Sequence, residues 1–215
     1  LDDKRIASWN ALAIGALARA GAALERPDWL EAARAAADFL LGEMRTPDGR
    51  LLRTWKDGRA HIAGYLEDHA FALEALLTLY EATFEPRWFA AARELADITI
   101  EHFADPQRGG FFTTAADHEA LLARRKDLDD APIPSGSSSI AYGLLRLAAL
   151  TGDGRYEDHS QRTLALVRDI APRHPQAFGH ALQALDFTVG PVREVAVVGP
   201  GADRLAAVVR GALRP

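Results

Sequence analysis

RPDWLEAARAAADFLL (residues 26–41) is repeated as EPRWFAAARELADITI (residues 85–100), and more faintly as DGRYEDHSQRTLALV (residues 153–167). The copies recur at a period of roughly 60 to 70 residues, and a fixed period of this kind indicates one supersecondary unit stacked on its neighbours. The repeat therefore predicts a stack of helical hairpins, in which each of these stretches is the second helix of a pair.

Apolar residues recur at helical spacing in further segments. The complete set before residue 190 is Ile6–Leu24, Trp29–Met44, Phe71–Phe84, Trp88–Phe103, Ile140–Leu150, Tyr156–Ile170 and Phe178–Val189. Pro, Gly and Asp cluster between these segments, where helices should stop or start. Two extended pieces, DGRLLRTW and GGFFTT, predict small hairpins or loops at one end of the stack.

Helices rich in small residues suit the crowded inner position of such a stack. This predicts an inner set of NALAIGALARAGA, AFALEALLTLYEAT, SIAYGLLRLAAL and FGHALQALDF. Helices of one set run parallel, so their N-termini should meet at the same end. Four segments would converge there: DDKRIASWN, YLEDHAF, IPSGSSSIA and PQAFGHALQ.

The tail REVAVVGPGADRLAAVVRGAL changes period and predicts one buried strand, a Gly-Pro-Gly turn and a further helix. We therefore expect a helical-hairpin domain over residues 1–190 and a strand–helix appendage over residues 191–215. The glycines are typical of a phosphate-binding turn, but the full G-x-G-x-x-G pattern is missing. A structural appendage is therefore favoured over nucleotide binding.

Composition excludes several functions. The chain has 215 residues, 48% hydrophobic and 26% charged, which suits one sizeable core. A net charge of −5 with scattered Lys and Arg disfavours nucleic acid. The absence of cysteine excludes thiolate chemistry, and the histidines lack the spacing of zinc ligands. No apolar run reaches the roughly 20 residues of a membrane span, and no signal peptide opens the chain. We expect no metal, no cofactor, no membrane contact and a cytoplasmic location.

The converging segments combine carboxylates, imidazoles, amides and an indole, which suit a hydroxyl-rich ligand. Glycoside hydrolysis generally needs two carboxyl groups, whereas epimerisation needs paired acid/base groups, often histidines. The candidates are Asp2, Asp3, Lys4, Trp9 and Asn10, then Glu67, Asp68 and His69, then Ser135, Ser137 and Ser138, and finally His180 and Gln183.

Each candidate also has a structural interpretation. Asp68 and the serines stand where N-caps and first-turn acids stabilise helices, and Glu67 is expected to be solvated. His69 and His180 also fit as interior histidines. Trp29 and Trp88 should pack between helices, which leaves Trp9 and Trp55 as the better platforms for a sugar ring.

Five segments carry a family resemblance: DDKRIASWNALAIGALARAG, IAGYLEDHAFALEALLTLYEAT, RGGFFTT, DDAPIPSGSSSIAYGLLRLAALTG and QAFGHALQALDFTVGPVREVAVVG. In order, they resemble the C-terminal part of the bacterial proteins related to the spermatogenesis-associated thioredoxin-domain protein. The resemblance implies about half of an (α/α)6 toroid, similar in architecture to N-acylglucosamine 2-epimerases and six-hairpin glycosidases. It also implies that the first half of the toroid and a thioredoxin-like domain precede this chain and are its partners.

The expected fold is therefore all-α, with repeated helical hairpins forming about half of an (α/α)6 toroid and a small C-terminal βα appendage. The leading functional hypothesis is a carbohydrate-binding or carbohydrate-modifying domain. Asp68 and Asp3 are its predicted catalytic residues, and its predicted substrate-binding residues are Asp2, Lys4, Trp9, Asn10, His69, Ser135, Ser138 and His180. The residues leave open whether the domain is an enzyme, either a sugar epimerase or isomerase or a glycoside hydrolase. The alternative is a non-catalytic scaffold that docks the thioredoxin-like domain or another protein.

Overall fold

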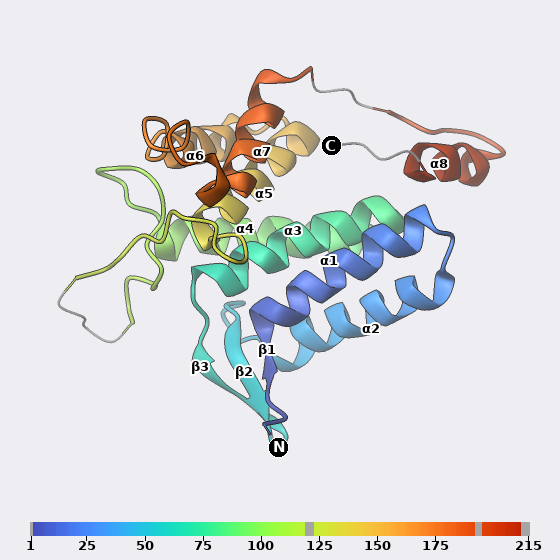
Figure 1. Cartoon of the computed structure of the whole chain (residues 1–215). Helices are drawn as coiled ribbons and strands as arrows, with labels where there is room; N and C mark the ends of the chain where they lie inside the picture. The colour runs from blue at the N-terminus through green and yellow to red at the C-terminus, as the bar shows by residue number, and fades with distance from the viewer. Residues whose placement is uncertain (1, 119–122, 192–194, 212–215) are drawn as a thin grey trace.

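The computed structural model describes residues 2–118, 123–191 and 195–211, and it consists mainly of helical hairpins (Figure 1). The elements are α1 (Ala7–Ala23), α2 (Pro27–Glu43), α3 (Leu66–Thr83), α4 (Pro86–Phe103), α5 (Gly136–Thr151), α6 (Gly154–Leu164), a 3-10 turn (Pro175–Ala177), α7 (Gly179–Val189) and α8 (Ala202–Gly211). The repeated helical hairpins expected from the sequence are confirmed.

The helices pack in two sets. Helix α1 lies against α3, α3 against α5, and α5 against α7, while α2, α4 and α6 each cover their own hairpin partner. Helix α3 lies at the centre of the main core, where Phe71, Leu73 and Leu76 pack with Trp88 and Phe103 of α4. A second cluster joins α5 and α7. The series α1, α3, α5 and α7 is the inner set predicted from small residues.

Several helix boundaries follow local sequence signals, and three helices differ in extent from the apolar pattern. Proline opens α2 and α4, Ser135 caps α5, and Asp153 caps α6. Helices α3 and α5 begin several residues before the apolar pattern predicted, because their first turns are polar or glycine-rich and carry no apolar periodicity. Helix α6 ends at Leu164, and the chain to residue 173 forms turns rather than the predicted extension to Ile170.

A small antiparallel sheet lies beside the start of α1. Its strands are β1 (Arg5–Ile6), β2 (Leu52–Lys56) and β3 (Arg59–Ala63), in the order β1-β2-β3. Asp57 and Gly58 make the β2–β3 turn with φ of 50° and 82°, the conformation that an Asp-Gly hairpin turn requires. The small hairpin predicted from the segment DGRLLRTW is confirmed, because β2 and β3 form it. The GGFFTT segment makes an isolated bridge between Ala104 and Phe111 within a loop.

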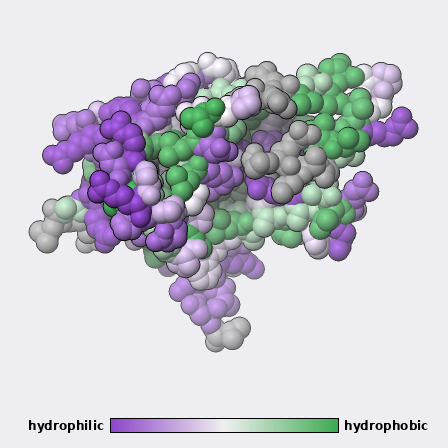
Figure 2. Space-filling view, turned by 45° about the horizontal axis from the view of Figure 1, so that its top comes forward, coloured by the Kyte–Doolittle hydropathy of each residue, from purple (hydrophilic) through white to green (hydrophobic). Residues whose placement is uncertain are grey.

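The C-terminal appendage differs from the prediction in one respect. Helix α8 is present and packs on α1, at the end where Figure 2 shows apolar surface gathered. The strand predicted before it is not formed over the described residues 195–198, where Val195 and Val198 are 58% and 86% exposed. A strand needs a neighbouring segment to pair its backbone groups, and no strand pairing with residues 195–198 is formed by the part of the chain that the structure describes. Residues 193 and 194 of the predicted strand lie outside the described residues, and the division at residue 190 stays a prediction.

Among the described helices, none combines the length and the apolar character needed to cross a membrane.

Candidate functional site at the inner-helix N-termini

The starts of the inner helices meet, as the parallel packing predicted. Ser8 at the start of α1 donates its backbone N–H to Asp68 in the first turn of α3. Gly136 at the start of α5 lies so close to α3 that a Cβ atom there would be 3.0 Å from the Glu67 nitrogen. Asp130 accepts hydrogen bonds from the first turns of both α5 and α7. Four segments distant in sequence therefore form one end of the molecule.

Asp68 is fully buried and bonded through both carboxylate oxygens. Oδ1 accepts the backbone N–H of Ser8 at 2.9 Å, and Oδ2 accepts that of Tyr65 at 2.9 Å. Arg53 of β2 donates a further bond to Oδ2 at 3.1 Å. Asp68 therefore caps α3 and ties the starts of α1, α3 and β2 together, with no oxygen left facing solvent.

The predicted partnership of Asp68 with Asp3 is not assembled. Asp3 is bound to Lys56 at 3.1 Å, and its side chain is 65% exposed. The Lys56 hydrogen bond and charge lower the pKa of Asp3. Asp2 and Lys4 form their own exposed ion pair at 3.0 Å. These residues lie on the surface beside the small sheet, so they share no accessible cavity with the buried Asp68.

His69 is an interior histidine in the structure. Its Nδ1 lies 2.9 Å from the Tyr65 carbonyl, and its Nε2 lies 3.1 Å from the Leu51 backbone N–H. A carbonyl needs a donor and an N–H needs an acceptor, so the ring is neutral with its proton on Nδ1. Complete burial lowers the pKa of His69 to about 4. The side chain holds the loop before β2 against α3 and does not face a ligand site.

Trp9 and Trp55, the two predicted platforms for a sugar ring, differ in how far their rings are exposed. Trp9 is 65% exposed near the start of α1, so its ring is open to a ligand. The face of Trp55 is covered by the Arg5 guanidinium at 4.3 Å, and Phe39 packs on its edge. Asn10, predicted to bind hydroxyl groups, donates to the Ile6 carbonyl within its own helix start. Trp9 is thus the platform that the structure leaves available.

Ser135 and Ser138 are tied into the start of α5. Ser135 Oγ accepts the Ser138 backbone N–H, and the two hydroxyl groups lie 2.5 Å apart. The Ser138 hydroxyl also donates to Asp130. Both residues are buried, yet Ser135 lines a pocket. Ser135 is therefore the serine that a ligand could reach.

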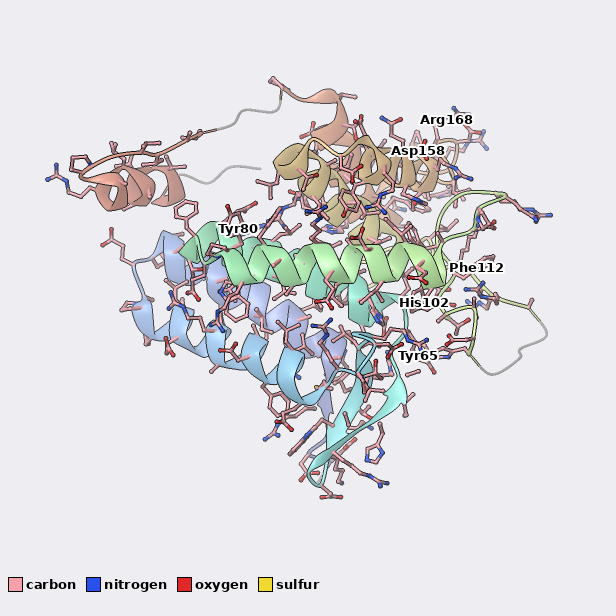
Figure 3. The ribbon with its side chains drawn as sticks, turned by 180° about the vertical axis from the view of Figure 1, so that it is seen from behind. Tyr65, Tyr80, His102, Phe112, Asp158 and Arg168 are labelled. Atoms are coloured by element: carbon pink, nitrogen blue, oxygen red, sulfur yellow. The ribbon has the colours of Figure 1, made fainter. Side chains whose placement is uncertain are left out.

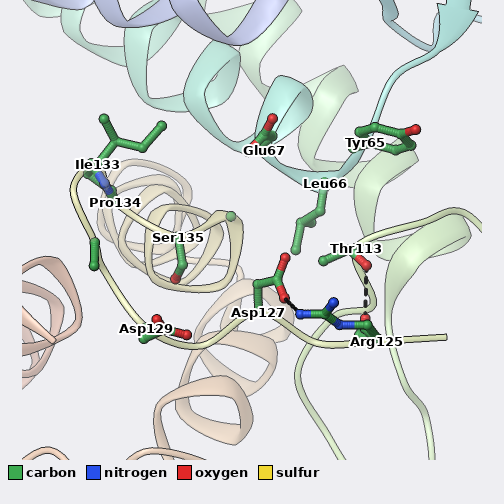
Figure 4. Close-up of a pocket in the computed structure, with 12 residues that line it drawn as sticks. Tyr65, Leu66, Glu67, Thr113, Arg125, Asp127, Asp129, Ile133, Pro134 and Ser135 are labelled. Atoms are coloured by element: carbon green, nitrogen blue, oxygen red, sulfur yellow. Dashed lines mark hydrogen bonds and ion pairs between the residues drawn. The ribbon is translucent and has the colours of Figure 1, made fainter. Parts of the chain in front are cut away.

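The pocket lies between the starts of α3 and α5 and has a volume of about 350 Å³ (Figure 4). Its polar lining includes Glu67 of α3 together with Arg125, Asp127 and Asp129 of the loop before α5. Arg125 pairs with Asp127 at 3.1 Å. The remaining lining residues are Tyr65, Leu66, Thr113, Ala131, Ile133, Pro134, Ser135 and Gly136.

Two further features shape this end of the protein. Arg53 donates to Glu67 at 2.7 Å and lies over the Tyr65 ring at 4.7 Å, which orients both residues. Figure 3 shows Tyr65 and Phe112 near one end of the helical stack and Tyr80 at the other. The polar pocket and the apolar surface near α8 are therefore at different ends.

His180 belongs to a neighbouring polar group. Its Nε2 lies 2.9 Å from Glu74 Oε1 of α3, and its Nδ1 lies 3.2 Å from the Gln183 amide oxygen. Its ring packs edge-on against Tyr142 of α5, with the ring centres 5.4 Å apart. His180 is thus partly buried but bonded to a carboxylate, and not enclosed in an apolar core.

Sequence reasoning missed Asp130 and Arg53. Asp130 stands in DDAPIP, where an acid ahead of a proline-containing helix start could have been recognised as a cap. Arg53 gives no local signal, because its partners Glu67 and Asp68 follow it by 14 and 15 residues and meet it only through the β2–β3 turn. Among the side chains that the structure describes, no group of three or more His, Asp or Glu residues is arranged to hold a metal ion.

The fold corresponds to about half of an (α/α) toroid, as comparison with solved structures shows. A D-mannose isomerase superimposes with a TM-score of 0.65 and 15% identity, over 79% of this chain and 46% of the other. The cellobiose 2-epimerase of Spirochaeta thermophila superimposes with a TM-score of 0.62 and 21% identity, over 79% of this chain and 44% of the other. An α-mannanase of Bacteroides thetaiotaomicron superimposes with a TM-score of 0.62 and 19% identity, over 75% of this chain and 44% of the other. At these identities the likeness concerns the fold.

The chain is homologous to spermatogenesis-associated protein 20. It is 34% identical to the mouse protein over 209 residues, which cover 93% of this chain and 26% of that protein. It is also 34% identical to the human protein, over 93% of this chain and 27% of that protein. The chain thus spans about a quarter of the length of these relatives. No protein-family model matches it.

Proposed function

We propose that this domain binds a carbohydrate in the pocket between the starts of α3 and α5 and modifies it by acid/base chemistry. The observation that carries the proposal is the polar lining of a pocket of about 350 Å³, which includes the Glu67, Asp127 and Asp129 carboxylates and the Arg125 guanidinium. Carboxylates and guanidinium groups form paired hydrogen bonds with neighbouring hydroxyl groups. A pocket of this size also falls in the range of small-ligand sites.

The surroundings of the pocket support this proposal. Ile133 and Pro134 supply apolar surface for the faces of a sugar ring, and the carboxylates supply acceptors for its hydroxyl groups. The names of the structurally similar proteins, a cellobiose 2-epimerase, a D-mannose isomerase and an α-mannanase, indicate action on carbohydrates. Similarity of fold alone does not establish an activity, so the proposal depends on the pocket.

A saccharide screen of the 215-residue chain tests the proposal. We expect a mono- or disaccharide to bind and to perturb the resonances of pocket residues in nuclear magnetic resonance spectra. Glu67→Gln and Asp129→Asn should each weaken that binding about 10-fold, because each removes a charged acceptor of a hydroxyl hydrogen bond. Isothermal titration calorimetry would give the dissociation constants.

Asp28→Asn is the matched control, because Asp28 is also an exposed carboxylate, paired with Arg26 at 2.6 Å on α2, away from the pocket. Its dissociation constant should equal that of the unsubstituted chain. An equal loss in Asp28→Asn and Glu67→Gln would contradict a site in this pocket. Failure of every saccharide to bind would favour the alternative of a docking scaffold.

A further inference from the structure

The pocket between the starts of α3 and α5 is lined by more negative groups than positive ones. Its charged lining consists of the Glu67, Asp127 and Asp129 carboxylates and the Arg125 guanidinium (Figure 4). Three carboxylates against one guanidinium leave negative charge in excess. A ligand that enters the pocket therefore meets a negative potential, which favours a cationic group over an anionic one.

The two helix starts at the pocket do not reverse this sign. The N-terminus of a helix carries partial positive charge and ordinarily favours an anion. Ahead of α3, Asp68 Oδ2 accepts the Tyr65 backbone N–H at 2.9 Å, and ahead of α5, Asp130 Oδ1 accepts the Ser135 backbone N–H at 2.8 Å. The protein thus supplies its own carboxylate at each helix start.

The guanidinium groups near the pocket are already bonded to carboxylates. Arg125 pairs with Asp127 at 3.1 Å, and its side chain is 79% exposed. Arg53, which does not line the pocket, binds both Glu67 at 2.7 Å and the buried Asp68 at 3.1 Å. Neither guanidinium group therefore offers an unpaired positive charge to a carboxylate or phosphate of a ligand.

Asp129 is the charged lining residue that has no hydrogen bond or ion pair with another of the described residues. It is exposed, and apolar side chains such as Leu66, Ile133 and Pro134 share the lining with it. In the described part of the chain, no group of three His, Asp or Glu side chains is arranged to hold a metal ion. The cation that fits is therefore an ammonium group on a compact ring.

We propose that the ligand of this pocket is an amino sugar with a free amine, whose ammonium group binds Asp129. This inference rests on the proposed carbohydrate function and names the class of carbohydrate. An ammonium group donates up to three hydrogen bonds and carries a positive charge, whereas a hydroxyl group donates one and is neutral. An N-acetylated amino sugar lacks the charge, and a uronic acid or a sugar phosphate carries the opposite charge.

Matched pairs of saccharides test this proposal, because the members of a pair differ only in a hydroxyl group or an amine on the same ring carbon. The pairs are glucose and glucosamine, galactose and galactosamine, mannose and mannosamine, and cellobiose and the β-1,4-linked glucosamine dimer. Isothermal titration calorimetry of the 215-residue chain at about pH 6, where the amine is protonated, would give the dissociation constants.

In every pair that binds, we expect the amino sugar to bind about fivefold more tightly, on the scale of an exposed ion pair. N-acetylglucosamine and glucuronate should both bind more weakly than glucosamine. The preference should shrink in about 0.5 M NaCl, because salt screens the charge interaction.

Asp129→Asn should remove the preference, since the amino sugar then loses about fivefold more affinity than the neutral sugar. Glu67→Gln is the matched variant. It also removes a lining carboxylate, but one that Arg53 already pairs. Both members of a pair should bind Glu67→Gln more weakly, while the preference for the amine persists.

The outcomes separate this inference from the proposed function. Equal affinities within every pair that binds, tighter binding of glucuronate than of glucosamine, or a preference that survives Asp129→Asn would overturn the inference. Each of these results would leave a carbohydrate site in this pocket standing. Failure of every mono- and disaccharide to bind would overturn the proposed function, and the inference with it.

Discussion

Asp68→Asn is expected to destabilise the fold by about 3 kcal/mol, because Asp68 is a fully buried carboxylate that accepts three hydrogen bonds. An asparagine amide turns an N–H₂ group toward at least one of these donors, and it also removes the charge that faces Arg53. Such a loss is a large fraction of the stability of a typical domain. Urea unfolding followed by circular dichroism would measure it as a fall in the midpoint.

Glu67→Gln is the matched comparison, since Glu67 is the preceding residue and binds the same guanidinium at 2.7 Å. Its side chain is 34% exposed, so loss of its charge should cost less than about 1 kcal/mol. Equal urea midpoints for the two variants would contradict the capping role of Asp68. The comparison also shows why Asp68→Asn is a poor probe of ligand binding: unfolding alone would remove any site at this end.

Acid should destabilise the protein through His69. Burial lowers the pKa of His69 to about 4, whereas an unfolded chain has an ordinary value near 6.5. Above pH 6.5 the ring is neutral in both states and contributes its full stability. Between pH 6.5 and 4 only the unfolded chain takes up the proton, so the free energy of unfolding falls by about 3 kcal/mol in total. Chemical unfolding at a series of pH values would measure this slope.

His69→Gln separates this contribution from those of other groups. Glutamine does not titrate, so the variant should lose the slope that His69 supplies between pH 6.5 and 4, although it is less stable at neutral pH. The pKa of His159 is also lowered by burial, and that of His180 is raised, so both still contribute to the remaining slope, with opposite signs. Identical slopes in the two proteins would show that His69 does not stay neutral in the folded state.

Local patterns were sufficient for the helices. The repeat, the prolines at the starts of α2 and α4 and the spacing of apolar residues predicted the hairpins and their order, although α3 and α5 begin earlier and α6 ends sooner than the apolar pattern indicated. The tail shows the limit of such patterns. REVAVV has the composition of a strand, but strand formation depends on a neighbour with unpaired backbone groups, and none of the described segments pairs with residues 195–198.

The meeting of the inner-helix starts was predictable from the sequence, whereas the contacts of the individual polar residues were not. The meeting of four helix starts follows from parallel inner helices, which the sequence indicates, and it correctly placed Ser135 and His180 at the same end. Whether a carboxylate in that region caps a helix or faces a pocket depends on which donors approach it from other segments. Asp68 accepts hydrogen bonds from Ser8, Tyr65 and Arg53, whereas Asp129 lines the open pocket.

The sequence by itself determined the helical hairpins, their order and the end of the stack where polar groups gather, because periodicity and helix-stop signals are local. Only the tertiary structure decided which of those groups are buried and which remain accessible. Burial and hydrogen bonding depend on contacts such as those of Ser8 with Asp68, 60 residues apart, and Glu74 with His180, 106 residues apart. Chain folding creates these contacts, and they remove Asp68 and His69 from the surface while leaving Glu67 and His180 accessible.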